Sequence, residues 1–165
     1  MSNDLRKITG VLACDSGYVI ANQGALPWSC PEEVAFYRGL IKNQVVVMGY
    51  ETYKQMPSSF VEEHHVVVFS KKHQSDVAPP AICVGSLEEF KRLKNLPVNK
   101  KYFMIGGEKI AKLFLENDLI DDFYLTEIHG NYPGDVFFPI NLLDKFKSSI
   151  FLSNPSFTVN YYEKP

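Results

Sequence analysis

The residues best suited to chemistry lie between positions 25 and 37, where the only tryptophan, Trp28, precedes the glutamates Glu32 and Glu33. A helix beginning at residue 30 or 31 places Glu33 at the edge of an apolar stripe and points Glu32 well away from it. Desolvation on such a face raises a carboxyl pKa toward the range of proton exchange near neutral pH. Glu33 is therefore a candidate proton-transfer group, although acidic residues also suit the first turn of a helix without any catalytic role.

The helix that carries Glu33 has two possible beginnings. Ser29 and Glu32 have the spacing of a capping box. Alternatively, Pro31 is the first helical residue, where its missing N–H costs nothing. The apolar stripe of this helix consists of Val34, Tyr37, Leu40 and Ile41.

Two glycine segments are candidates for phosphate binding. Gly49, followed by Thr52, and the pair Gly106-Gly107 each come where an apolar run ends and a helix is expected. Without a Cβ, the backbone N–H groups at a helix N-terminus are open to a phosphate. Glycine also serves ordinary tight turns. Two such junctions, together with the cationic segment Ser70-Lys71-Lys72, favour a dinucleotide ligand.

The elements that must position these residues alternate along the chain. Strands are expected at residues 7–14, 44–48, 66–69, 81–84, 102–105, 122–128, 149–153 and 157–162, and further helices at 50–56, 87–93 and 108–116. This order predicts an α/β fold with a central, mostly parallel twisted sheet of about eight strands, flanking helices and a C-terminal antiparallel hairpin. In such sheets ligands gather at the carboxyl ends of the strands. Residues 15–23 are expected to form a long loop of the kind that is usually functional.

Length and composition restrict the class of protein. The 165 residues predict a single domain (residues 1–165), and a net charge of −2 argues against a general nucleic-acid or membrane-surface binder. The polar N-terminal segment lacks the apolar core of an export signal, so a cytoplasmic location is expected. Three cysteines, Cys14, Cys30 and Cys83, are expected to be free thiols, and no metal motif is found. Without a heptad repeat or an evident surface patch, a monomer is expected.

Together these segments resemble bacterial dihydrofolate reductase, from about Ile8 to Tyr162. Four motifs carry the resemblance: Val19-Ile20-Ala21 leading to Leu26-Pro27-Trp28-Ser29-Cys30-Pro31-Glu32-Glu33, then Val47-Met48-Gly49-Tyr50-Glu51-Thr52, then Ile105-Gly106-Gly107, then Tyr124-Leu125-Thr126 with Gly134-Asp135-Val136-Phe137-Phe138-Pro139. The resemblance implies NADPH-dependent reduction of 7,8-dihydrofolate to tetrahydrofolate, with hydride transfer to C6 and protonation at N5.

The resemblance also implies roles for individual residues. Glu33 would pair with the pterin 2-amino group and N3, Thr126 would be its hydroxyl partner, and Trp28 would help hold an ordered water. Residues 15–23 match a mobile flap over the nicotinamide, controlled by Asn22, Gln23 and Asp135, and Gly106-Gly107 matches a cis peptide. The implied substrate contacts are Val11, Leu12, Ala13, Leu26, Val34, Tyr37, Arg38, Met56 and Ile105. The implied cofactor contacts are Ala13, Ile20, Gly49, Tyr50, Thr52, Ser70, Lys71, Ile105, Gly106, Gly107, Lys109 and Ile110.

The sequence departs from the family pattern in three respects. Glu63 stands where an arginine usually holds the glutamate tail of the substrate, so either Arg38 takes over this role or the natural substrate is a tailless pterin. Tyr50 stands where a cation usually contacts the 2′-phosphate, which leaves Ser70, Lys71 and Lys109 for NADPH and makes NADH less favoured. Third, Ala21 stands where the flap usually has glycine, and Glu108 and Ala111 replace a small residue and an aromatic residue beside the cofactor.

These departures leave alternatives to dihydrofolate reduction open. One is a reductase of a tailless dihydropterin or, with less support, of a riboflavin precursor. Another is a pterin- or nucleotide-binding paralogue without efficient catalysis. Retention of Trp28, Glu33 and Thr126 together favours catalysis.

Overall fold

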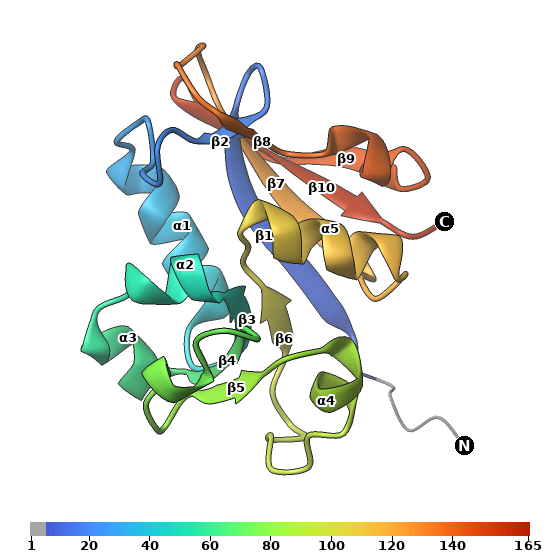
Figure 1. Cartoon of the computed structure of the whole chain (residues 1–165). Coiled ribbons are helices and arrows are strands. Elements are labelled where there is room, and N and C mark those ends of the chain that lie inside the picture. The colour runs from blue at the N-terminus through green and yellow to red at the C-terminus, as the bar shows by residue number, and fades with distance from the viewer. Residues whose placement is uncertain (1–5) are drawn as a thin grey trace.

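The chain forms an eight-stranded sheet with helices on both faces in the computed structural model, which describes residues 6–165 (Figure 1). The strand order is β5-β4-β3-β6-β1-β7-β10-β9. Neighbouring strands from β5 to β7 are parallel, whereas β10 pairs antiparallel with both β7 and β9. The bounds are β1 Ile8–Asp15, β3 Val45–Gly49, β4 His65–Phe69, β5 Ile82–Val84, β6 Tyr102–Met104, β7 Asp122–Ile128, β9 Lys147–Ser153 and β10 Phe157–Glu163. The predicted fold class and C-terminal hairpin are confirmed, and the N-terminal segment judged to lack an export signal lies largely outside the described residues.

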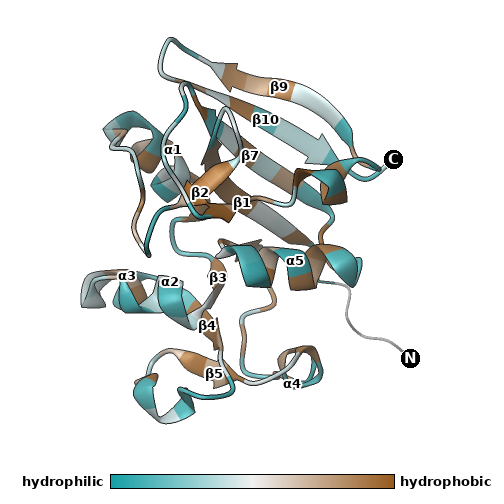
Figure 2. Ribbon diagram, turned by 45° about the horizontal axis from the view of Figure 1, so that its top comes forward, coloured by the Kyte–Doolittle hydropathy of each residue, from teal (hydrophilic) through white to brown (hydrophobic). Residues whose placement is uncertain are grey.

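Both faces of the parallel strands are buried, which explains their continuous apolar sequences. Within β3, Val45 and Val47 belong to the cluster under α4 (Leu87–Lys91) and α5 (Glu108–Glu116). Val46 and Met48 point the other way, toward the cluster that includes residues of α1 (Pro31–Ile41), α2 (Tyr50–Lys54) and α3 (Ser58–Glu63). Figure 2 shows the resulting pattern, with hydrophobic strands inside and hydrophilic residues on the helices.

The helix that carries Glu33 begins as one of the two alternatives predicts. Pro31 occupies the first turn of α1, and the N-cap residue Cys30 makes no side-chain hydrogen bond. The capping box of Ser29 and Glu32 is therefore not formed. In α4, by contrast, the Ser86 hydroxyl accepts a hydrogen bond from the backbone N–H of Glu89 across 3.2 Å, as expected for a capping serine.

Residues 15–23 are not wholly a loop, so this prediction is corrected. The buried Asp15 carboxylate accepts 2.8 Å hydrogen bonds from the backbone N–H groups of Gly17 and Val19, which fixes a tight turn. The turn leads into β2 (Val19–Ala21), which pairs antiparallel with β8 (Val136–Phe137) outside the main sheet. Such short strands depend on a distant partner and carry little periodic signal of their own.

Three further short helices, α3 and the 3-10 turns η1 (Gln74–Asp76) and η2 (Ile140–Leu143), are absent from the prediction. Strand β9, at the edge of the sheet, also exposes an apolar surface that the sequence analysis does not expect. Its residues Ile150, Phe151 and Leu152 are 69%, 55% and 40% exposed. None of the described helices is long and apolar enough to cross a membrane.

Candidate active site

A cavity of about 600 Å³ opens at the carboxyl ends of β1 and β3, between α1, α2 and the beginning of α5. Its volume is typical of small-molecule sites. Most of the predicted site residues line it: Val11, Leu12, Ala13, Ile20, Leu26, Glu33, Val34, Tyr37, Gly49, Tyr50, Thr52, Met56, Ile105, Gly107, Lys109 and Ile110. Segments distant in sequence thus meet at the edge of the sheet where ligands were expected.

Some predicted residues do not line the cavity, and some lining residues were not predicted. The first group is Trp28, Arg38, Ser70, Lys71, Gly106, Thr126, Asn22, Gln23 and Asp135. The second group is Gly24, Ala25, Glu51, Gln55, Phe69, His73 and Val136. Ala21 and Glu108, which the sequence analysis places in the flap and beside the cofactor, line the cavity as well. Most of the second group adjoin predicted residues in sequence, so a wider window around each motif would have found them. His73 carries no such signal beyond its position just after Ser70 and Lys71.

Glu33 reaches the cavity from the first turn of α1. Burial raises the pKa of its carboxyl from an ordinary value of 4.5 to about 7. Among the described residues, none forms a hydrogen bond or ion pair with this carboxyl. One turn further, burial also raises the pKa of Tyr37 to about 12, so this phenol stays neutral beside it. Glu33 is thus an acid that holds and releases a proton near neutral pH.

Trp28 and Thr126 lie in the wall behind the cavity. The indole of Trp28 is buried and packs edge-on against Tyr132, with 5.8 Å between the ring centroids. Its Nε1–H has no hydrogen-bond partner among the described residues, so it is a buried donor that suits a water or ligand acceptor. Thr126 is buried on β7 in register with Ala13 of β1. No hydrogen bond joins Thr126 to Glu33 in this structure.

The two glycine junctions meet at the opposite end of the cavity. The Gly49 N–H donates a 2.8 Å hydrogen bond to the Gly106 oxygen, and the Gly106-Gly107 peptide is cis. A Cβ on Gly49 would lie 3.1 Å from Ile110, and one on Gly106, whose φ is +106°, would lie 2.8 Å from Leu12. No side chain caps the N-terminus of α5, which follows Gly107. At this end of the cavity the backbone packs closely, and the uncapped N-terminus of α5 gives it a partial positive charge.

Tyr50 adds an aromatic stack to the end of the cavity where the two glycine junctions meet. Its ring lies parallel to that of His73, with 4.1 Å between centroids and 6° between planes. His73 is held in turn by Asp76, whose carboxylate lies 3.0 Å from Nδ1. The backbone N–H of His73 donates to the Ser70 hydroxyl across 3.0 Å. The loop that follows β4 is thereby fixed against α2, with Ser70 and Lys71 at its start.

Residues 15–23, here called the flap, are tied at their end. The Asp135 carboxylate accepts hydrogen bonds from the Gln23 N–H, at 3.1 Å and 3.2 Å from its two oxygens. The backbone N–H of Asp135 donates to the Ala21 oxygen across 3.1 Å. From the other side of the cavity, the Gln55 amide donates to the oxygen of Gly24, the residue after the flap, across 3.1 Å. The contact between Asp135 and the flap is the one that the resemblance implies.

Comparison with known proteins agrees with this arrangement. A family model described as dihydrofolate reductase matches residues 7–153. The chain belongs to the dihydrofolate reductase family. It is 28% identical over 167 residues to dihydrofolate reductase of Lactococcus lactis, with 95% of this chain and 97% of the relative covered. It is 27% identical over 140 residues to dihydrofolate reductase type A13 of Escherichia coli, with 85% of this chain and 82% of the relative covered.

Membership in the dihydrofolate reductase family supports an oxidoreductase that carries out dihydrofolate reduction in general. Against the family pattern, the two residues considered for the substrate tail stand apart from the cavity. Arg38 is exposed on α1, and Glu63 is exposed at the end of α3. Neither lines the cavity, in which Lys109 is the only lysine or arginine among the described lining residues.

Proposed function

We propose that this member of the dihydrofolate reductase family reduces 7,8-dihydrofolate to tetrahydrofolate with NADPH, by hydride transfer to C6 and protonation at N5. The observation that carries the proposal is the Glu33 carboxyl, which faces the cavity with a pKa raised to about 7. Such a group pairs with the amino edge of a pterin when ionised and supplies a proton equivalent when protonated.

The residues at the phosphate end fit NADPH. The close-fitting backbone at Gly49 and Gly106-Gly107, the Thr52 hydroxyl and the uncapped end of α5 suit a diphosphate. Ser70 and Lys71 would hold the 2′-phosphate, with Lys109 at the rim. When bound, NADPH supplies the hydride. NADH is the less favoured cofactor, because it lacks the 2′-phosphate with which Lys71 would pair.

The walls of the cavity would orient the substrate and exclude water. Val11, Ala13 and Ile105 line the cavity and would form an apolar floor beneath the pterin. Glu33 would fix one edge of the ring by accepting hydrogen bonds from the 2-amino group and N3. The unpartnered Nε1–H of Trp28 would hold a water on the other side. The flap, tied through Asp135, would close the site and keep bulk water away from the reacting atoms.

A second candidate function is reduction of a dihydropterin without the glutamate tail. It is favoured by the positions of Arg38 and Glu63, which leave the cavity without an arginine to clamp a tail carboxylate. Such a clamp normally takes the form of a bidentate pair. The same cavity chemistry would serve both substrates.

Absorbance at 340 nm tests both candidates through the oxidation of NADPH. Dihydrofolate and a tailless dihydropterin are each titrated to saturation, with NADPH and then with NADH. A much lower KM for dihydrofolate supports the first function, and equal or better use of the tailless pterin supports the second. Binding of either compound without NADPH oxidation would refute both and indicate a non-catalytic paralogue.

A further inference from the structure

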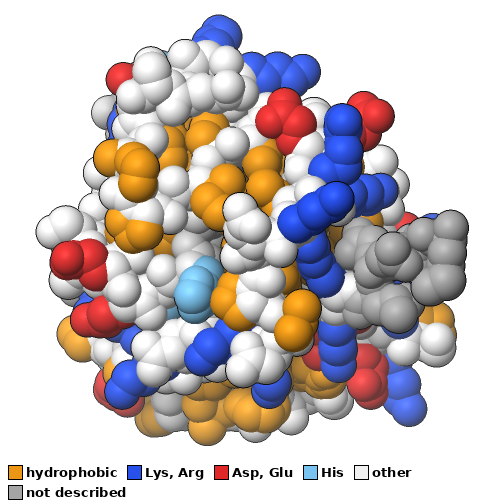
Figure 3. Space-filling view, turned by 90° about the horizontal axis from the view of Figure 1, so that it is seen from below, with side chains coloured by type: hydrophobic (Ala, Val, Ile, Leu, Met, Phe, Trp, Pro, Cys, Tyr) orange, Lys and Arg blue, Asp and Glu red, His pale blue; other side chains and the backbone are white. Residues whose placement is uncertain are grey.

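A second hollow of about 610 Å³ lies at the amino-terminal ends of β1, β6 and β7, the opposite edge of the sheet from the candidate active site. Its charged lining residues are Arg6, Lys7, Lys94, Lys100, Lys101 and Asp122. Figure 3 shows lysine and arginine side chains gathered on this underside of the molecule. The hollow shares no lining residue with the first cavity.

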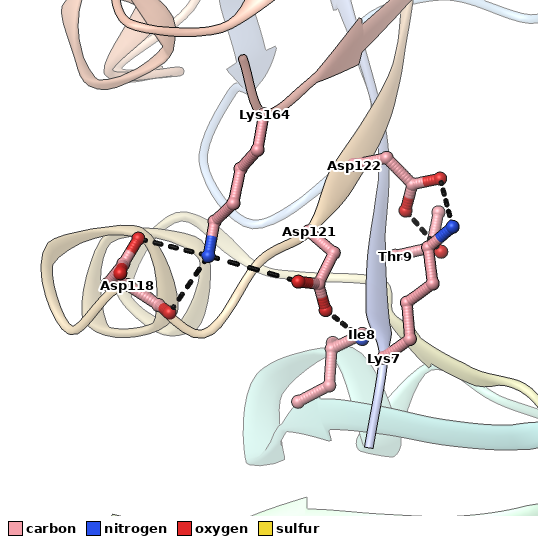
Figure 4. Close-up of polar contacts among 7 residues, drawn as sticks. All are labelled: Lys7, Ile8, Thr9, Asp118, Asp121, Asp122 and Lys164. Carbon is pink, nitrogen blue, oxygen red and sulfur yellow. Dashed lines mark hydrogen bonds and ion pairs between the residues drawn. The ribbon is translucent and has the colours of Figure 1, made fainter. Parts of the chain in front are cut away.

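The hollow is strongly positive in a protein of slight negative charge. Five cations and one carboxylate line it, whereas the whole chain carries a net charge of −2. The one carboxylate already has partners: Asp122 accepts hydrogen bonds from the hydroxyls of Thr9 and Tyr161, and Lys7 lies 3.6 Å from it. Figure 4 shows its contacts with Thr9 and Lys7. No carboxylate within residues 6–165 pairs with Lys94, Lys100 or Lys101 in this structure. Cations gathered in this way repel one another and attract anions.

Part of this charge is held in a fixed position. The Arg6 guanidinium donates hydrogen bonds to the backbone oxygens of Leu93 and Phe90, across 2.6 Å and 3.3 Å. It also lies over the rings of Phe90 and Tyr102, 5.7 Å and 5.3 Å from their centroids. The backbone N–H of Lys101 donates to Gln44 Oε1 across 2.8 Å, which anchors the chain from which this lysine extends. An anion therefore meets cations that are in part already ordered, which lowers the entropy cost of binding.

We propose that this hollow is a binding site for a small anion with several charges, of the di- or triphosphate type. The number of cations calls for a multivalent ligand, and the volume is that of a small-molecule site rather than of an extended polymer track. The lining also includes residues that would accept an uncharged group attached to the phosphates: Leu40, Leu93, Leu96, Val98, Phe103 and Tyr124. The ligand is thus either a free phosphate chain or the phosphate chain of a nucleotide.

Calorimetric titration of the full chain with inorganic tripolyphosphate tests the site. The test variant is Lys94→Gln/Lys100→Gln/Lys101→Gln. The control is Lys112→Gln/Lys145→Gln/Lys147→Gln, which removes the same charge from exposed positions elsewhere. We expect wild type and control to bind with dissociation constants within twofold of each other, and the test variant to bind at least tenfold more weakly. Equal weakening in both variants would reduce the effect to overall charge and overturn the proposal.

Two further arms define the ligand and the place. ATP is then titrated in place of tripolyphosphate. Tighter binding of ATP would indicate a nucleotide ligand, and equal binding would indicate that the site recognises the phosphate chain alone; either result supports the site. Saturating NADPH should leave the dissociation constant unchanged. Because NADPH itself carries a diphosphate, its competition is compared with the effect of the substitutions: binding that NADPH abolishes and that the test variant does not weaken would place the anion in the first cavity and overturn the proposal. So would binding of anionic vesicles or an oligonucleotide that is tighter than ATP and lost in the test variant, because it would indicate a macromolecular partner.

Discussion

The side-chain amide of Gln55 donates a hydrogen bond to the backbone oxygen of Gly24, linking the end of α2 to the residue after the flap across 3.1 Å. The two residues face each other over the cavity and both line it. On the other side, Asp135 holds the adjacent residue Gln23. The end of the flap is therefore held from both walls, and the contact from Gln55 is one that bridges the cavity.

Replacing Gln55 with Met should weaken cofactor binding. The variant keeps the length of the side chain but removes the donor that holds the end of the flap at the cavity. One exposed hydrogen bond contributes about 0.5–1.5 kcal/mol, so we expect a loss of roughly two- to tenfold in NADPH affinity. Quenching of Trp28 fluorescence during an NADPH titration would measure it, since the chain has a single tryptophan. Unchanged affinity would show that this contact does not contribute to cofactor binding.

Replacing Lys71 with Gln should affect NADPH and NADH differently. A hydrogen bond to a charged group contributes about 1.5–3 kcal/mol, so the KM for NADPH should rise on the order of 10- to 100-fold while that for NADH stays nearly constant. The neighbouring Lys72→Gln is the matched control and should change neither constant more than about twofold. Equal increases for both cofactors after Lys71→Gln would exclude a contact with the 2′-phosphate.

The stability of the protein should depend on pH through Glu33. Its pKa is raised from 4.5 to about 7, so the folded state binds an extra proton between these values and loses stability as the pH rises through them. The variant Glu33→Gln has no titrating group at this position, so this position makes its stability neither rise nor fall with pH. Relative to wild type, its free energy of unfolding should increase on the order of 1–3 kcal/mol between pH 4.5 and pH 8.

Urea unfolding at several pH values measures this difference. Glu32→Gln, at the exposed neighbouring position, serves as control and should follow the wild-type pH dependence. A constant difference in stability between Glu33→Gln and wild type across this range would contradict the raised pKa.

Two glycines should respond in opposite ways to substitution by alanine. A Cβ on Gly10 in β1 would lie 2.2 Å from the ring of Phe123, whereas one on Gly39 in α1 has nothing within 4 Å. Gly10→Ala should therefore cost about 1–3 kcal/mol through overpacking. Gly39→Ala should stabilise by about 0.5–1 kcal/mol, because alanine favours a helix. Thermal unfolding of both variants checks this, and destabilisation by both would show that crowding at Phe123 is not the cause.

Sequence reasoning predicted the elements whose signal is local. The bounds of α5 and the place of the terminal hairpin follow from periodicity and turn residues, and the place of Glu33 follows from its position on one helix. Strand β9 begins two residues earlier than predicted, at Lys147. Strands β2 and β8 were not predicted, because they are only three and two residues long and form only by pairing with each other.

The misses at the site have physical reasons too. The stack of Tyr50 on His73 joins the first residue of α2, which follows β3, to the loop after the neighbouring strand β4. It becomes visible only once the order of these strands in the sheet is known. The position of Arg38 away from the cavity, however, could have been predicted from helix geometry. Arg38 lies five residues after Glu33, about 140° around the helix, whereas Tyr37 at four residues shares the face of Glu33.

The measurement that tests the central claim most directly is the rate of NADPH oxidation with saturating dihydrofolate at pH 7, for wild type and Glu33→Gln. We predict that wild type turns over and that the variant is slower by about 10²- to 10⁴-fold, the usual contribution of a proton-transfer group. Near-wild-type turnover in Glu33→Gln, or no oxidation by the folded wild-type protein, would contradict the assignment of Glu33 as the acid of this site.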